Sequence, residues 1–323
     1  MKCIRFHEHG GPDVLRAEDC EVTRPAAGEV QVRHTAIGLN YIDVYDRTGL
    51  YPGELPGCPG REAAGVITAL GRNVHGFRVG DRVAYVHSAP GAYCDVRNLP
   101  AARLVKIPKG IAEEQAAALM LKGLTAQFLL RRTHRVQRGE AILVHAAAGG
   151  VGLLLTQWAK ALGAQVIGVV GSDAKAELAR KSGCRHVLLS GRGALAPEVR
   201  RLTRGAGVAV VYDSVGRDTF MDSLDCLRPL GLMVSFGNAS GPVPPIAPLE
   251  LSRRGSLFLT RPTLFHYIAG REPLDAAARE LFAAVKKGVL RVRIGQRYAL
   301  SEAAQAHRDL EARLTTGSTV LIP

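Results

Sequence analysis

A run of small residues in the middle of the chain has the composition of a loop that binds phosphate through its backbone. Residues 145–152 read His-Ala-Ala-Ala-Gly-Gly-Val-Gly, between apolar residues 141–144 and a helix expected over 150–162. Small residues let the backbone approach a pyrophosphate closely, and the N-terminus of the following helix attracts its negative charge. Ala147 takes the first glycine position of the G-x-G-x-x-G pattern. We therefore expect a nicotinamide dinucleotide at Ala147, Ala148, Gly149, Gly150 and Val151.

The end of the next expected strand, residues 165–170, bears on the choice between NAD and NADP. It is followed by Gly171 and Ser172, with Lys175 one turn into the next helix. A hydroxyl and an ammonium group suit a 2′-phosphate, whereas an acidic residue that binds the ribose hydroxyls would favour NAD. Asp173 is acidic and adjacent, and it points away from the ribose if its side chain caps the helix over 173–182. We therefore expect NADP(H).

Two sequence patterns surround these residues and must position them. Roughly the first 120 residues form short strands broken by Gly and Pro, which is typical of an irregular β domain. Apolar stretches then alternate with helices, which indicates an α/β fold with a doubly wound parallel sheet. The tail is expected to return to the first domain. The expected strands are 29–33, 63–70, 82–86, 141–144, 165–170, 186–189, 208–212, 232–236 and 318–322, and the later helices are 150–162, 173–182, 197–202, 274–287 and 301–310.

Further motifs extend along the whole chain, among them residues 9–12, 38–43, 47–52, 121–125, 211–216 and 235–238. With the phosphate-binding run, they resemble the zinc-free NADPH:quinone oxidoreductases (zeta-crystallin-like) of the medium-chain dehydrogenase/reductase superfamily. The resemblance implies a β-rich GroES-like catalytic domain over residues 1–123, completed by 264–323, and a Rossmann domain over 124–263 that binds NADP(H). It also implies a homodimer.

The resemblance also implies roles for individual residues. Asn40, Asp43 and Tyr45 would line the nicotinamide and substrate region. At the third strand, relatives often have a tyrosine that binds the 2′-phosphate, whereas this chain has Ser190 and then Arg192. Either Arg192 supplies the positive contact, or the preference for NADP is weaker than usual. The other cofactor contacts that the resemblance implies are Thr125, residues 147–151, Gly171, Ser172, Lys175, Phe236, Gly237, Asn238 and Arg313.

The positions that hold zinc in related alcohol dehydrogenases carry other residues in this chain. Asn40 stands where those enzymes have a cysteine, and the Gly-His-Glu triplet reads Gly60-Arg61-Glu62. Zinc prefers thiolate, imidazole or carboxylate ligands. We therefore expect no metal, and a substrate reactive enough to accept hydride with help from hydrogen bonds alone.

Quinones meet this condition, so an NADPH-dependent quinone reductase is the expected function, with Asn40 and Tyr45 orienting the carbonyl oxygen. An NADPH-dependent enone or alkenal reductase shares every motif. A cofactor-sensing RNA-binding or structural protein is the alternative of another class, since the net charge is +13. No nucleic-acid motif accompanies that charge.

Composition adds few constraints. No apolar run reaches the roughly 18 residues of a membrane span, and the first residues lack the apolar core of a signal peptide. The six cysteines are scattered without a C-x-x-C pair, so we expect mostly reduced thiols. The expected location is the cytoplasm, with no membrane partner.

Overall fold

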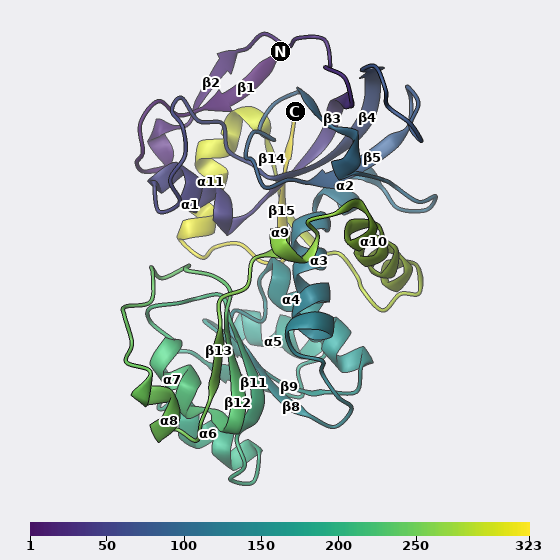
Figure 1. Ribbon diagram of the computed structural model, residues 1–323. Helices are drawn as coiled ribbons and strands as arrows, with labels where there is room; N and C mark the ends of the chain where they lie inside the picture. Colours follow the sequence, from purple (N-terminus) through teal and green to yellow (C-terminus); the bar gives the residue numbers. More distant parts are fainter. The chain divides into compact units, whose positions relative to one another are not determined.

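The chain leaves its first folded unit within helix α3 (Met120–Phe128) and returns to it after Tyr267. The computed structural model describes all residues 1–323. Unit 1 consists of Met1–Leu124 and Ile268–Pro323, and unit 2 of Thr125–Tyr267. Figure 1 accordingly shows the purple start and the yellow end of the chain in the same unit.

Unit 2 is built on a six-stranded parallel sheet with the order β10-β9-β8-β11-β12-β13. Helices α4 and α5 pack on each other and on β9, while α7 packs on α6, β11 and β12 (Figure 1). All six residues of β11 are buried, as in a strand covered on both faces. The strand order reverses between β8 and β11, and in doubly wound sheets ligands bind beside the carboxyl ends of the strands at that point.

The elements of unit 2 confirm most of the sequence expectations. Strand β12 begins earlier than expected because Pro229 and Gly231 interrupt its apolar pattern. The short α7 and β13 were not expected. The strands are β8 (Ala141–Val144), β9 (Gln165–Val170), β10 (His186–Leu189), β11 (Val208–Asp213), β12 (Leu227–Ser235) and β13 (Phe258–Thr260). The helices are α4 (Gly150–Ala161), α5 (Asp173–Ser182), α6 (Leu195–Leu202), α7 (Phe220–Asp225), α8 (Leu249–Arg253) and α9 (Leu264–Tyr267), and a π-helical turn covers Leu129–Thr133.

Unit 1 contains a largely antiparallel sheet with the order β14-β15-β3-β4-β5-β7, in which β6 also pairs with β3. Strand β3 is the longest, and its residues from Ala36 to Leu39 are buried where it leads into helix α1. The strands are β3 (Glu29–Leu39), β4 (Glu62–Leu70), β5 (Arg82–Val86), β6 (Val96–Pro100) and β7 (Leu104–Lys106). The helices are α1 (Tyr41–Thr48) and α2 (Glu113–Ala117), with 3₁₀ turns at Pro12–Val14, Ala101–Arg103 and Leu300–Glu302.

The tail of the chain completes this sheet, as expected from the sequence. It contains α10 (Arg271–Lys286), β14 (Ile294–Ala299), α11 (Ala303–Glu311) and β15 (Ser318–Ile322). Strand β15 pairs antiparallel with β3, which places Thr319 opposite Leu39. The closing strand therefore supports the stretch of β3 that positions Asn40.

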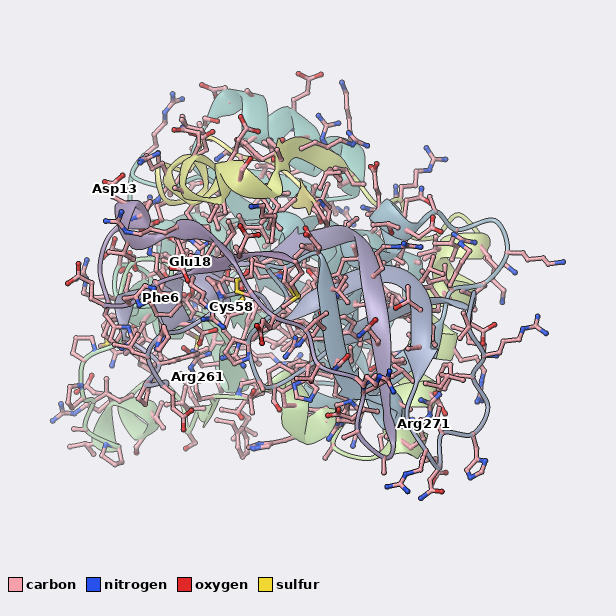
Figure 2. The ribbon with its side chains drawn as sticks, turned by 90° about the horizontal axis from the view of Figure 1, so that it is seen from above. Phe6, Asp13, Glu18, Cys58, Arg261 and Arg271 are labelled. Carbon is pink, nitrogen blue, oxygen red and sulfur yellow. A yellow bond between two sulfur atoms is a disulfide. The ribbon has the colours of Figure 1, made fainter.

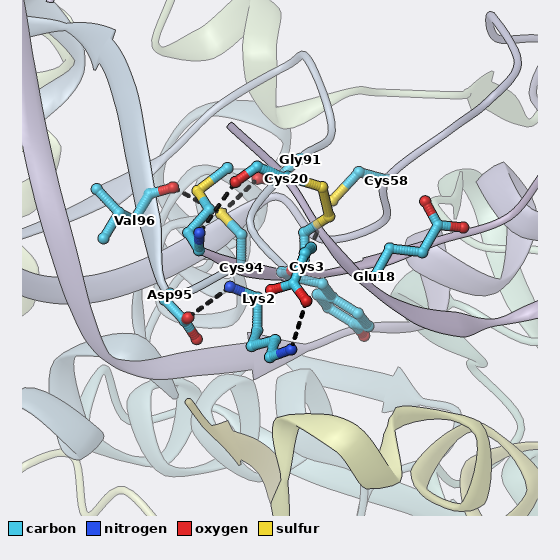
Figure 3. Close-up of a disulfide and its surroundings, with 12 residues drawn as sticks. Lys2, Cys3, Glu18, Cys20, Cys58, Gly91, Cys94, Asp95 and Val96 are labelled. Carbon is cyan, nitrogen blue, oxygen red and sulfur yellow. Dashed lines mark hydrogen bonds and ion pairs between the residues drawn. A yellow bond between two sulfur atoms is a disulfide. The ribbon is translucent and has the colours of Figure 1, made fainter. Parts of the chain in front are cut away.

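A hairpin of β1 (Lys2–Arg5) and β2 (Arg16–Asp19) begins the chain, and Cys3 forms a disulfide with Cys20 beside it (Figure 3). The scattered cysteine spacing did not predict this bond, whereas the other four cysteines are thiols as expected. Figure 2 shows Phe6 and Cys58 near the hairpin, where Phe6 pairs with Gly57 in an isolated bridge. None of the helices has the length and apolar character that crossing a bilayer requires.

Candidate active site

The turn between β8 and α4 has the geometry of a phosphate-binding loop. Ala146 adopts a left-handed conformation with φ of 49°, and the N–H of Gly149 donates to its carbonyl oxygen at 2.9 Å. A Cβ on Gly152 would overlap that same oxygen and lie 2.8 Å from the Cα of Ala147. Only glycine therefore permits the helix to begin this close to the turn. The first N–H groups of α4 have no carbonyl partner within the helix and can bind a pyrophosphate.

The residues expected at the 2′-phosphate gather where β9 and β10 end. Ser172 caps α5, and its Oγ accepts the backbone N–H of Lys175 at 3.4 Å. A Cβ on Gly171 would lie 3.9 Å from the Oγ of Ser190. Two hydroxyls and a lysine thus lie within one small region.

The sequence left open whether Asp173 caps helix α5. Its side chain does not cap α5, because Ser172 does so; it forms an ion pair with Arg192 at 3.2 Å. Both side chains are exposed. Asp173 and Arg192 therefore balance each other's charge. The cationic residue next to the Ser172 hydroxyl is Lys175.

The turn after β12 contains Phe236, Gly237 and Asn238, and it packs against the turn after β11. The backbone N–H of Phe236 donates to the carbonyl oxygen of Asp213 at 2.8 Å. A Cβ on Gly237 would meet the Cα of Ser214 at 2.8 Å. The buried Asp213 carboxylate holds its own turn by accepting the N–H of Val215 at 2.7 Å and the hydroxyl of Thr219 at 2.7 Å. The loops after β8, β11 and β12 thus all lie at the same edge of the sheet.

Two further expected cofactor contacts lie elsewhere in the chain. Thr125 is a buried residue of α3. Arg313 follows α11, has a φ of 60°, and its charge lowers the pKa of Tyr41, although burial raises that pKa overall. Arg313 therefore lies in unit 1, near the start of α1.

The start of α1 brings Asn40 and Asp43 together. Asn40 is the residue before the helix, and its backbone N–H donates to Oδ2 of Asp43 at 2.9 Å. The hydroxyl of Tyr93 donates to the same oxygen at 3.0 Å. The other carboxyl oxygen, Oδ1, is buried and has no hydrogen-bond partner. Burial of the carboxyl group raises the pKa of Asp43 to about 7, with the nearby Asp46 as a further cause.

Tyr45 belongs to a cluster of three tyrosines at α1. Its ring centroid lies 5.6 Å from that of Tyr41 and 5.2 Å from that of Tyr51. The N–H of Tyr51 also donates to the carbonyl oxygen of Tyr45 at 3.1 Å. The rings meet at tilted and edge-to-face angles, and such a cluster of phenol rings suits a flat, apolar molecule that carries polar oxygens.

A chain of buried hydrogen bonds extends from Asp43 to helix α11. Nε2 of His307 lies 3.1 Å from the hydroxyl oxygen of Tyr93, and Nδ1 lies 3.1 Å from the guanidinium of Arg47. Because Tyr93 donates its only hydrogen to Asp43 and Arg47 is a donor, His307 carries its proton on Nε2. Burial, followed by the charge of Arg47, lowers the pKa of His307 to about 3. The imidazole is therefore neutral and fixed in one tautomer.

The side chain of Asn40 is directed to Glu62, a contact that the sequence did not predict. Its amide nitrogen donates to Oε1 of Glu62 at 2.7 Å and to the carbonyl oxygen of Gly38 at 3.3 Å. Glu62 is in turn paired with Lys122 at 2.9 Å. The sequence did contain an indication of these buried charges, because Glu62 and Lys122 are charged residues within otherwise apolar stretches. Spacing alone did not reveal that they meet.

Arg61 stands where related alcohol dehydrogenases have a zinc-binding histidine, and it forms an ion pair with Asp46. Nε of Arg61 donates to Asp46 at 2.9 Å and Nη2 donates to the same carboxylate at 2.6 Å. Both side chains are largely buried. With Asn40 bonded to Glu62 and Arg61 bonded to Asp46, the donors at these positions do not suit a zinc ion.

Comparison with known proteins relates both units to dehydrogenases. Residues 26–109 match the family described as alcohol dehydrogenase GroES-like domain, and residues 150–285 match the one described as zinc-binding dehydrogenase. The second description implies a zinc ion, which the residues at Asn40 and Arg61 do not fit. The match thus concerns the fold of the unit and not its metal.

Individual relatives cover the whole chain. The chain is 53% identical to a quinone oxidoreductase of Pseudomonas aeruginosa, over 100% of this chain and 99% of that protein. It is 47% identical to a 2-haloacrylate reductase of a Burkholderia species, over 98% of each chain. A crystal structure of Escherichia coli quinone oxidoreductase complexed with NADPH superposes with a TM-score of 0.98 at 49% identity, covering 100% of both chains. The chain therefore belongs to the quinone oxidoreductase family of the medium-chain dehydrogenase/reductase superfamily.

Proposed function

We propose that this chain reduces quinones with NADPH by a route that uses neither zinc nor flavin. The observation that carries the proposal is the turn at Gly152, where only glycine fits, beside the Ser172, Lys175 and Ser190 group. These features fit a dinucleotide with a 2′-phosphate. Quinone oxidoreductases from two bacteria, at 53% and 49% identity, support the substrate class.

The cofactor residues divide into three groups by the part of NADPH that they bind. Residues 147–151 hold the pyrophosphate through backbone N–H groups. Gly171, Ser172, Lys175 and Ser190 hold the 2′-phosphate, while Arg192 is balanced by Asp173 and contributes less. The bound cofactor supplies hydride from its nicotinamide ring. The proposed contacts near the nicotinamide are Asn40, Thr125, Phe236, Gly237, Asn238 and Arg313.

The proposed substrate residues lie at α1. The tyrosine cluster provides stacking surface, and the hydroxyl of Tyr45 orients the quinone oxygen that gains negative charge. Asn40 does not share this role, because both N–H bonds of its amide are already donated to Glu62 and Gly38. Asp43 holds a proton close to neutral pH and maintains the start of α1. The proton that completes the hydroquinone comes from water.

Substitution of Tyr45 tests the substrate half of the proposal. Tyr45→Phe keeps the ring and removes the hydroxyl, so kcat/KM for a 1,4-quinone should fall roughly tenfold, as for one lost hydrogen bond to the transition state. Affinity for NADPH, followed by fluorescence titration, should stay unchanged. Tyr51→Phe is the matched control in the same cluster. An unchanged kcat/KM in Tyr45→Phe would remove this residue from the mechanism.

A second assay separates quinones from activated alkenes, because one relative is a 2-haloacrylate reductase. Under the proposal, kcat/KM with 1,2- and 1,4-quinones exceeds that with alkenals and 2-haloacrylates. The reverse order would assign the chain to alkene reduction on the same scaffold.

We further propose that the units correspond to a catalytic domain (1–123 with 264–323) and a cofactor domain (124–263). The protein is proposed to act as a cytoplasmic homodimer. Nucleic-acid binding forms no part of the proposal, since only the net charge of +13 points to it.

A further inference from the structure

Glu62 is a fully buried carboxylate whose position is fixed by three donors. It stands on β4 opposite Gly38 of β3. Lys122 Nζ donates to its Oε1 at 2.9 Å and to the carbonyl oxygen of Leu39 at 3.1 Å, while the N–H of Leu121 donates to Oε2 at 2.5 Å. A Cβ on Gly38 would overlap the carboxylate. Glu62 therefore has no room to turn, and both of its oxygens are engaged.

The amide of Asn40 is oriented by this carboxylate. Its nitrogen lies 2.7 Å from Glu62 Oε1 and 3.3 Å from the Gly38 carbonyl oxygen. Both neighbours are acceptors, so the atom facing them must be the nitrogen, whose two hydrogens are then both used. A flipped amide would place oxygen against a carboxylate oxygen. The atom that Asn40 has left for a ligand is its carbonyl oxygen, which is an acceptor only.

We propose that Glu62 and Lys122 are positioning residues that make Asn40 an obligate hydrogen-bond acceptor, and that Asn40 thereby recognises the carboxamide N–H of the nicotinamide and not the quinone. An oxidised quinone offers carbonyl oxygens, which cannot donate to Asn40. The nicotinamide offers an –NH₂ group, which can. The inference rests on the proposed function, because it assigns Asn40 to the reactive end of NADPH.

The proposed orientation of the Asn40 amide explains why Glu62 and Lys122 are charged. A buried ion pair is weak evidence for stability, because desolvation offsets much of the attraction. A neutral glutamine at position 62 could present either oxygen or nitrogen, and the Asn40 amide could then turn. A carboxylate presents acceptors only, and burying it requires the Lys122 ammonium.

Cofactor analogues provide the test. The reduced 3-acetylpyridine analogue of NADPH has a methyl group in place of the carboxamide –NH₂, whereas the thionicotinamide analogue keeps the –NH₂. Wild-type protein should bind the acetylpyridine analogue roughly three- to tenfold more weakly than NADPH, as for one lost hydrogen bond, and the thionicotinamide analogue nearly as well as NADPH. Asn40→Leu, which has no amide, should bring the ratio of acetylpyridine to NADPH dissociation constants close to one.

The positioning role is tested with the variant Glu62→Gln/Lys122→Met, which removes both charges together. It should also bring the ratio of acetylpyridine to NADPH dissociation constants close to one, because the Asn40 amide is then free to turn. The matched control is Asp46→Asn/Arg61→Met, which removes another buried ion pair that does not touch Asn40 and should keep the wild-type ratio. A merely structural role for Glu62 would weaken all cofactors equally and leave the ratio unchanged, even where the unfolding temperature falls.

The inference and the proposed function can fail separately. Wild-type protein that binds NADPH and its acetylpyridine analogue equally, yet reduces quinones with NADPH, would overturn the inference and keep the function. Retention of the wild-type ratio by Asn40→Leu, or by Glu62→Gln/Lys122→Met, would also overturn it. Strong discrimination between the cofactors without quinone turnover would support the inference and contradict the function.

Discussion

At the scale of single residues, the buried carboxyl group of Asp43 has a raised pKa that leads to a testable prediction. One of its oxygens accepts hydrogen bonds from the backbone of Asn40 and the hydroxyl of Tyr93, while the other has no partner. Burial outweighs these bonds and the charge of Arg61, so its pKa rises to about 7. The remaining neighbours do not compensate, since Asp46 adds negative charge and His307 is neutral.

This pKa leads to a testable pH dependence of stability. Because the folded-state pKa of about 7 lies above the ordinary value of 3.8, the carboxyl contributes fully to stability below about pH 4 and this contribution is lost as the pH rises through 7. Asp43→Asn imitates the protonated form. Between pH 4 and 8, the free energy of unfolding of the wild type should fall relative to that of Asp43→Asn, by up to about 4 kcal/mol.

Urea unfolding at a series of pH values measures this difference. Parallel curves for the two proteins would show that Asp43 is already ionised at low pH in the folded state. Asp309→Asn, at a half-buried position hydrogen-bonded to Tyr298, serves as a control that leaves the Asp43 carboxyl intact.

Motifs in the sequence singled out Asn40 and Asp43 but did not show how their side chains are held. Asn40 and Asp43 were found through their motif, and they do meet at the start of α1. The orientation of the Asn40 amide depends on Glu62 and Lys122, which are distant in sequence and reach it only through the pairing of β3 with β4 and the placement of α3. The sequence left open whether Asp173 caps α5, because Asp and Ser both cap helices well, and in the structure Ser172 is the cap.

At the scale of elements, the link between β8 and α4 is the most constrained part of unit 2. Ala146 is in a left-handed conformation, and Gly152 has no space for a side chain because the carbonyl oxygen of Ala146 occupies it. The helix can begin this close to the strand only with glycine at position 152. The phosphate-binding N–H groups depend on that start.

Gly152→Ala should therefore displace the start of α4 and weaken NADPH binding by at least roughly tenfold, as for loss of one or more hydrogen bonds to a charged phosphate. It should also lower the free energy of unfolding by roughly 1–3 kcal/mol through overpacking. Fluorescence titration and urea unfolding measure the two effects. Gly53→Ala is the control, since an added Cβ there meets nothing within 4 Å. Unchanged NADPH affinity in Gly152→Ala would separate this turn from the cofactor.

Elements with strong periodicity were predictable, and short or interrupted ones were not. Strands β9 and β10 and helix α5 have the bounds expected from the sequence, because the two strands are short apolar runs and the helix lies between a Ser172 cap and Gly183. Strand β13 has three residues and helix α7 has six, too few for a pattern to emerge. The antiparallel neighbours in unit 1, such as β15 beside β3, depend on contacts between the two ends of the chain.

At the scale of the whole molecule, the cofactor and substrate residues come from separate parts of the chain. Unit 2 supplies the three loops at the carboxyl edge of a parallel sheet, and unit 1 supplies α1, the tyrosine cluster and the Glu62 network. The net charge of +13 belongs to a chain with 42 Lys and Arg residues, many of which form exposed ion pairs. Such pairs contribute little to stability individually, and they give no sign of a specific nucleic-acid site.

The function assigned to the whole molecule is NADPH-dependent reduction of a quinone by the chain's own residues. The measurement is single-turnover oxidation of NADPH by a 1,4-quinone, followed at the nicotinamide absorbance, with purified flavin-free protein and excess metal chelator. We predict rapid oxidation that the chelator does not slow, and much weaker binding when NADH replaces NADPH. Absence of quinone-dependent oxidation, or its loss on addition of chelator, would contradict the assigned function.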